Sequence, residues 1–163
     1  MTDFKALLRA LSDSGVEFIL VGGAAATVHG STRLTVDVDA VYRRTSENIE
    51  RLVLALTPYH PYLRGAPPGL PFRWDGPTIK RGLNFTLTTD IGDVDLLGEI
   101  TGGGGYDDLA AATLGIRVFG VECRCLTLDK LIEVKRAAGR PKDFEAIAEL
   151  EAIREQRARG GRP

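Results

Sequence analysis

The sequence predicts an α+β fold, in which helices pack on one face of a mixed sheet and a helical pair closes the chain. Three observations support this fold class. The length of 163 residues suits one domain with one core. Stretches with strand and helix patterns follow one another without regular βαβ alternation, which favours an α+β sheet. The breaker Gly139-Arg140-Pro141 separates two helical stretches near the end of the chain.

Apolar periodicity defines the elements expected in the first half of the chain. Apolar residues recur at helical spacing from Phe4 to Leu11, and Ser14-Gly15 ends this helix. The further elements expected in this half are a buried strand over 16–21, a small-residue helix over 24–29, a strand over 35–42 and a helix over 46–56 capped by Ser46.

The second half begins with a long segment, 57–78, that is rich in proline and glycine and has no period. A loop of this length is usually functional or mobile. The four glycines 102–105 indicate a flexible linker. The other expected elements are strands over 80–89 and 93–97 joined by a hairpin turn, a short helix over 106–112, strand material over 116–125, a helix from Thr127 to 138 and a last helix to about Arg154. One domain is expected over 1–156, followed by a basic, flexible tail over 157–163.

Composition is that of an ordinary globular protein. The formal net charge is −1, so no global field attracts the chain to nucleic acid or to an anionic membrane. No apolar run approaches the roughly 20 residues of a membrane span, and the first residues carry no apolar signal core. Cys123 and Cys125 are too close for an ordinary disulfide and lack histidine partners for zinc. We therefore expect reduced cysteines and a cytoplasmic location.

Asp37 and Asp39 are the first candidates for a chemical site. On a strand they project to one face, while Val38 projects to the other. Two carboxylates on one partly desolvated face raise each other's pKa and cost stability. A divalent cation removes this cost, and oxygen ligands suit Mg²⁺ or Mn²⁺. The alternative is a solvated strand end, but the aliphatic neighbours indicate an interior strand.

A second acidic pair, Asp93 and Asp95, has the same spacing on another predicted strand. A third carboxylate on an adjacent strand would complete a ligand set for two cations, which in such sites lie about 3.5–4 Å apart. Asp93 borders the hairpin turn, where contact with water is enough to account for an aspartate without a metal-binding role. Asp95 lies deeper, between Val94 and Leu96, and is the expected ligand.

Gly22-Gly23 lies where a strand is expected to give way to a helix. Glycines let backbone N–H groups approach a phosphate, and the start of a helix favours anions. The alternative is a tight turn that serves close packing alone.

Together these features resemble the nucleotidyltransferase superfamily, whose members have the DNA polymerase β-like fold. The resemblance begins with a strand, Gly22-Gly23, a small helix and the motif His-Gly-x-x-Arg-x-Thr-x-Asp-x-Asp, which runs from His29 to Asp39. It continues with Gly-Asp-Val-Asp-Leu-Leu at 92–97 and Lys-Arg-Ala-Ala-Gly-Arg-Pro-Lys-Asp at 135–143, and so covers nearly the whole chain. The later blocks are similar to a bacterial branch that includes toxins of abortive-infection toxin–antitoxin pairs.

The resemblance implies roles for individual residues. It makes Asp37, Asp39 and Asp95 both metal ligands and catalytic residues, with Mg²⁺ or Mn²⁺ as the cofactor. The nucleotide-binding residues that it implies are Gly22, Gly23, Arg33, Lys135, Arg140 and Lys142.

The resemblance leaves alternatives or qualifications for several residues. The resemblance implies that Asp143 orients Lys135 or Arg140 rather than binding metal. On the residues alone, Lys135 and Arg140 can equally be surface charges at helix ends. Arg33 can instead form a structural ion pair with one of the strand carboxylates. Members of the superfamily usually have Gly-Ser where this chain has Gly22-Gly23, so one hydroxyl contact is lost.

The expected function is the transfer of a nucleotidyl group from a nucleoside triphosphate to an acceptor, with Mg²⁺ present and pyrophosphate released. The acceptor class is left open among tRNA, a protein side chain and a small molecule. An antitoxin protein is a further expected partner, and no membrane partner is expected. The alternative function is a non-catalytic module that keeps the fold and binds a nucleotide or a protein partner, which the missing serine favours.

Overall fold

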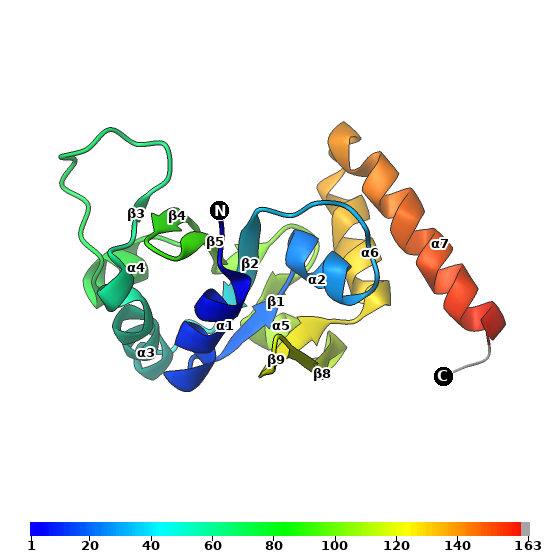
Figure 1. Ribbon diagram of the computed structural model, residues 1–163, viewed down its shortest axis with the longest axis horizontal. Coiled ribbons are helices and arrows are strands. Elements are labelled where there is room, and N and C mark those ends of the chain that lie inside the picture. Colours follow the sequence, from blue (N-terminus) through cyan, green and yellow to red (C-terminus); the bar gives the residue numbers. More distant parts are fainter. Residues whose placement is uncertain (161–163) are drawn as a thin grey trace.

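The computed structural model describes residues 1–160, and a seven-stranded mixed sheet forms their centre (Figure 1). The strand order is β3-β4-β5-β2-β1-β9-β8. These strands are β1 (Phe18–Leu20), β2 (Asp37–Tyr42), β3 (Tyr62–Leu63), β4 (Phe85–Thr89), β5 (Gly92–Leu97), β8 (Thr113–Val118) and β9 (Val121–Leu126). The pairs β2–β5 and β1–β9 are parallel, and the other neighbours are antiparallel.

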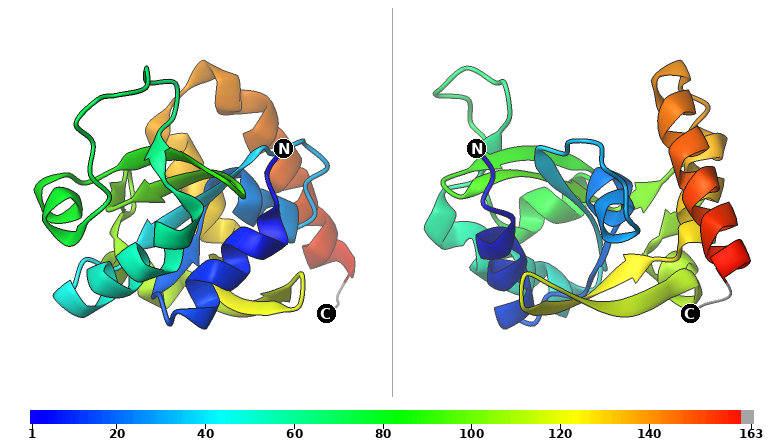
Figure 2. Two further views of the ribbon diagram at one scale, coloured as in Figure 1. Left: turned by 60° about the vertical axis from the view of Figure 1, so that its left-hand side comes forward. Right: turned by 45° about the vertical axis from the view of Figure 1, so that its right-hand side comes forward.

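Helices pack against this sheet, and the last two form a pair along one side of the molecule (Figure 2). They are α1 (Phe4–Asp13), α2 (Gly22–Val28), α3 (Ser46–Leu56), α4 (Gly76–Arg81), α5 (Tyr106–Leu109), α6 (Leu128–Ala138) and α7 (Phe144–Gly160). The predicted α+β fold, with its mixed sheet and C-terminal helical pair, is confirmed. Within residues 1–160, no helix is both long and apolar enough to cross a membrane.

Side-chain caps begin α3 and α6, as Asp3 does for α1. Thr127 caps α6 as predicted, because its hydroxyl accepts a hydrogen bond from Lys130 N at 3.2 Å. α3 is capped one residue earlier than predicted: Thr45 accepts from Asn48 N at 3.2 Å, and Ser46 is the first helical residue. Each such cap contributes about 1 kcal/mol to helix stability.

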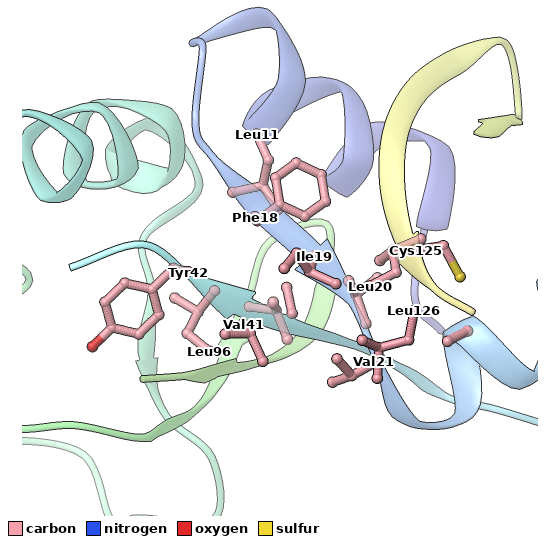
Figure 3. Close-up of a cluster of buried hydrophobic side chains, with 14 of the residues drawn as sticks. Leu11, Phe18, Ile19, Leu20, Val21, Val41, Tyr42, Leu96, Cys125 and Leu126 are labelled. Atoms are coloured by element: carbon pink, nitrogen blue, oxygen red, sulfur yellow. The ribbon is translucent and has the colours of Figure 1, made fainter. Parts of the chain in front are cut away.

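The apolar face of the central strands forms the core. Val38 and Ala40 of β2, with Val94 and Leu96 of β5, are at most 1% exposed. α1 and α3 pack against each other, and their buried leucines join these side chains in one cluster, part of which is shown in Figure 3. Because side chains alternate along a strand, this burial turns the aspartates of β2 and β5 to the opposite face.

The segment that precedes β4 differs from the prediction. Residues 80 and 81 lie in α4 rather than in a strand, and β4 begins only at Phe85. Asp75 caps α4 by accepting from Thr78 N at 2.9 Å, and Pro77 fits the first turn, where its missing N–H costs nothing. These local signals outweigh the β-rich pattern further along the chain.

Three other predicted elements also differ. Gly104–Gly105 is not a linker but a short strand, β7, which pairs with β6 (Glu99–Ile100). The strand material after residue 112 is a hairpin of β8 and β9 that turns at Phe119-Gly120. α7 continues to Gly160 and so includes the first residues of the predicted tail, whereas residues 161–163 lie outside the described part of the chain.

Candidate metal and nucleotide site

Asp37, Asp39 and Asp95 meet on the parallel pair β2–β5. In the register of this pair, Asp39 lies opposite Asp95 and Asp37 lies opposite Asp93. One carboxylate oxygen from each of Asp37, Asp39 and Asp95 lies within 4.8 Å of the other two. The predicted grouping of these three side chains is confirmed. Asp93 shares their face of the sheet but lies outside the group.

The surroundings of Asp39 oppose its ionisation. Burial, followed by the neighbouring Asp37 and Asp95 carboxylates, raises the pKa of Asp39 to about 8. Gly23 N–H donates to Asp39 Oδ2 at 3.3 Å, which lowers the pKa of Asp39 but does not outweigh these causes. Burial and the charge of Asp95 also raise the pKa of Asp37, against the effect of Arg64. A bound cation would remove the penalty that these carboxylates impose on one another.

Gly22 and Gly23 bring the start of α2 against Asp39. Gly22 has a φ of +58°, which favours glycine, and a Cβ there would lie 2.3 Å from Asp39 Oδ2. A Cβ at position 23 would lie 2.8 Å from Thr35 Oγ1, so a threonine hydroxyl fills the space that a side chain would need. The glycines therefore serve the placement of a carboxylate, and their contact with a phosphate stays a prediction.

Arg64, directly after β3, is a site residue that the sequence analysis missed. Its Nη2 lies 2.9 Å from Asp95 Oδ1, its Nη1 3.5 Å from Asp37 Oδ2 and its Nε 3.4 Å from Asp93 Oδ2. The backbone is fixed beside β4, where Arg64 N donates to Thr86 O at 3.0 Å. Arg64 lies in a segment without periodicity, so no pattern of its own predicts its position. The only indication in the sequence is the excess of carboxylates, which needs a cationic partner.

Basic side chains of α6 and the turn after it are held by Asp143. Arg140 Nε donates to Asp143 Oδ2 at 2.7 Å, and Lys135 Nζ lies 3.7 Å from Asp143 Oδ1. Burial alone would raise the pKa of Asp143, but the Arg140 hydrogen bond and the charge of Lys135 outweigh it and lower that pKa. Asp143 therefore contacts both Lys135 and Arg140, as the orienting role implied by the resemblance requires, and that role stays a prediction.

Two cavities lie beside the three carboxylates. The larger has a volume of about 460 Å³, and its lining includes Gly22, Asp39, Asn84, Asp95, Lys135 and Arg140. The smaller, of about 160 Å³, has a lining that includes Gly23, Arg33, Asp37, Asp39 and Lys135. Asp39 and Lys135 therefore face both cavities, and the larger one is within the usual size range of ligand pockets.

Within residues 1–160, none of the predicted basic nucleotide-binding residues forms an ion pair with the three carboxylates. Arg33 Nη1 pairs with Glu145 Oε2 of α7 at 3.5 Å, so the predicted alternative pairing with a strand carboxylate is wrong. The loop after α2 reaches toward α7 before β2 begins, and it carries Arg33 with it. Lys142 is exposed in the turn between α6 and α7 and lines neither cavity.

The donor set fits a hard divalent cation. All three grouped side chains offer carboxylate oxygen, the ligand type that Mg²⁺ and Mn²⁺ prefer. Asp95 Oδ1 is buried and accepts no well-aligned hydrogen bond, although Arg64 Nη2 lies 2.9 Å away. A buried acceptor without a well-aligned hydrogen bond costs free energy, and coordination of a metal ion by Asp95 Oδ1 would remove that cost.

Comparison with known proteins identifies the fold. No protein-family model matches the sequence, and no curated protein matches it. A solved structure of a candidate nucleotidyltransferase from Thermotoga maritima is similar, with a TM-score of 0.57 and 13% sequence identity. The match covers 90% of this chain and 88% of that one. The fold is nucleotidyltransferase-like.

Proposed function

We propose that this chain is a metal-dependent nucleotidyltransferase that transfers a nucleotidyl group from a nucleoside triphosphate to an acceptor. One observation carries the proposal: Asp39 and Asp95 line the same cavity as Lys135 and Arg140. Nucleotidyl transfer needs anionic groups that hold a metal ion and cationic groups that neutralise phosphates. The fold shared with the Thermotoga maritima protein and the motifs of the sequence support the same reaction class and membership of the superfamily.

The proposed mechanism assigns each side chain one task. Asp37 and Asp39 would hold Mg²⁺ or Mn²⁺, and Asp95 would complete the ligand set and accept the proton of the acceptor hydroxyl. A bound divalent ion supplies charge neutralisation to the leaving pyrophosphate. Lys135 and Arg140 would bind the triphosphate, in orientations that Asp143 maintains. Further proposed nucleotide contacts are Gly22, Gly23, Arg33 and Lys142.

Because the acceptor is unknown, the activity test follows a label in the α-phosphate of the nucleotide into whichever acceptor receives it. The protein is incubated with each α-labelled nucleoside triphosphate, Mg²⁺ or Mn²⁺, and separate pools of tRNA, protein and small metabolites. We expect label in one pool together with released pyrophosphate, and neither product with Asp95→Asn. If the protein binds a nucleotide but releases pyrophosphate with none of the pools, it is instead the non-catalytic module, which the glycine at position 23 favours.

The finer proposal is a toxin of a toxin–antitoxin pair that acts in the cytoplasm through a single domain over 1–156. The resemblance of the blocks 92–97 and 135–143 to a bacterial branch that includes such toxins supports it. Induced expression in a bacterial host should stop growth, and expression of Asp39→Asn at the same level should not. Unimpaired growth with the active protein would remove the toxin role and leave the transferase proposal intact.

A further inference from the structure

Arg64 provides the positive charge at the acidic face of the sheet. Its guanidinium contacts Asp37 and Asp95 of the proposed ligand triad and also Asp93 outside it. We propose that Arg64 competes with the divalent cation for Asp37 and Asp95, so that the metal binds only when the guanidinium leaves them. This inference rests on the proposed metal site and adds the residue that sets its affinity.

The contacts of Arg64 with Asp93 and Asp95 are poorly aligned, and its hydrogen bond to Asp37 Oδ2 is long at 3.5 Å. Asp95 Oδ1 and Arg64 Nε are both buried, yet neither makes a hydrogen bond of good geometry. Each guanidinium nitrogen meets a different carboxylate, so no bidentate pair forms with any of them. Misaligned hydrogen bonds are weak, and bidentate pairs are the strong ones. Arg64 therefore neutralises the aspartates without being locked to them.

A metal ion and the guanidinium need the same two carboxylates. Arg64 Nη2 lies 2.9 Å from Asp95 Oδ1, and Arg64 Nη1 lies 3.5 Å from Asp37 Oδ2. Both carboxylates belong to the group whose oxygens could hold an ion. Two cations at one pair of carboxylates repel each other in a partly buried site, where water screens charge poorly. Occupation by one therefore disfavours the other.

The guanidinium can leave the triad without unfolding the strand that carries it. Arg64 N donates to Thr86 O at 3.0 Å, a backbone contact that a change of side-chain rotamer leaves intact. Arg64 Nη2 also donates to Leu87 O at 2.8 Å, and Asp93 lies outside the metal-binding group. The side chain is 27% exposed, which leaves room for rotation. Leu87 O and Asp93 thus remain as partners for Arg64 when the triad binds a cation.

Calorimetric titration with MnCl₂ tests the competition directly. A site that the guanidinium occupies about nine-tenths of the time is open for about one-tenth of it, so Arg64→Ala should bind Mn²⁺ about tenfold tighter than wild type. Arg64→Lys keeps the charge but cannot reach three carboxylates, and its affinity should lie between the two. Arg73→Ala is the matched control, because Arg73 is an exposed arginine of the same loop. Its removal changes the net charge equally and should leave the affinity unchanged.

Thermal melts supply a second measurement that does not depend on activity. In EDTA, Arg64→Ala should melt at a lower temperature than wild type, because the carboxylates lose their cation. Mn²⁺ should then raise its Tm by more than it raises that of wild type. Equal or weaker Mn²⁺ affinity in Arg64→Ala and Arg64→Lys overturns the inference and leaves the metal site standing. The double variant Asp37→Asn/Asp39→Asn is the reference for a lost metal site. If wild type, Arg64→Ala and Arg64→Lys all bind Mn²⁺ no better than this variant, the metal site and the competition are both wrong.

Discussion

Gly22 and Asp39 lie so close together that no side chain fits between them, since a Cβ at position 22 would lie 2.3 Å from Asp39 Oδ2. This contact joins the first residue of α2 to the middle of β2. It places Gly23 N–H 3.3 Å from the same carboxylate oxygen. The glycine is therefore required by the acidic site and not only by the turn.

Gly22→Ala should push the Asp39 carboxylate away from Asp95 and lower Mn²⁺ affinity about 10- to 100-fold, the usual effect of disturbing a group that supports a metal ligand. Gly120→Ala is the matched control. Gly120 has a φ of +75°, but a Cβ there would meet nothing within 4 Å. Both variants should lose about 1–2 kcal/mol of stability through backbone strain. Calorimetry and denaturant unfolding measure the two effects, and equal losses of Mn²⁺ affinity would contradict the role of Gly22.

Asp39 should make the metal-free protein less stable as pH rises. Its pKa is about 8 in the folded chain and near 3.9 in an unfolded one. The folded state holds the proton more tightly, so this contribution to stability is complete below pH 4 and is lost between about pH 4 and pH 8. Asp39→Asn should flatten this decline, which melts in EDTA across that range would show. For the same reason, Mn²⁺ affinity should increase with pH up to about 8, because binding displaces a proton.

Asp143 offers a control of opposite sign for this pH experiment. Although burial opposes its ionisation, Arg140 and Lys135 hold its folded pKa below the ordinary value. Its contribution is therefore present above the unfolded pKa and is lost as pH falls through the folded one. Asp143→Asn should reduce stability at neutral pH and leave the decline between pH 4 and pH 8 in place. A flattened decline in this variant would show that Asp39 is not its source.

The carboxylate triad could be predicted because strand alternation is a local rule. Asp37, Asp39 and Asp95 each lie beside buried aliphatic residues, and period two is enough to place them on one face. Their meeting required β2 and β5 to be neighbours, which the expected ligand set assumed and the register confirms. The same rule fails at Arg33, because β2 begins only at Asp37 and no alternation extends back to it.

Arg64 could not be predicted, because its position depends on a pairing that the sequence does not signal. β3 has two residues, Tyr62 and Leu63, and no apolar pattern distinguishes them from the loop. Only their register with β4 brings the next residue to the acidic face. The place of Thr35 was hidden for a similar reason, since its hydroxyl fills the space beside Gly23 through tertiary packing alone.

Lys135→Ala should weaken nucleotide binding and leave Mn²⁺ binding intact. Lys135 lines both cavities, whereas the carboxylates do not depend on it for their position. We expect a loss of about 1.5–3 kcal/mol, the value of a hydrogen bond to a charged group. Lys130→Ala is the control on the same helix, because Lys130 pairs with Glu133 and lines neither cavity. Titration with a non-hydrolysable nucleotide and Mn²⁺ would reject the assignment if both variants bound equally well.

The pair Asp95 and Asp93 tests the geometry of the whole site, because these residues share a strand face and differ in what they meet. Asp95 lies opposite Asp39 and belongs to the ligand group, whereas Asp93 lies opposite Asp37 and outside that group. Asp95→Asn should lower turnover by orders of magnitude and largely preserve nucleotide affinity, because Asp37 and Asp39 can still hold a cation.

Asp93→Asn should change stability and activation free energy by no more than about 0.5 kcal/mol, as for a surface substitution. Its ion pair with Arg64 is 3.4 Å long and Arg64 Nε makes no well-aligned hydrogen bond, so its loss should cost little. Pyrophosphate release and nucleotide affinity, measured separately for both variants, decide the matter. Loss of turnover in Asp93→Asn with normal turnover in Asp95→Asn would exchange the two roles. Normal turnover in both would place the third catalytic carboxylate elsewhere in the chain.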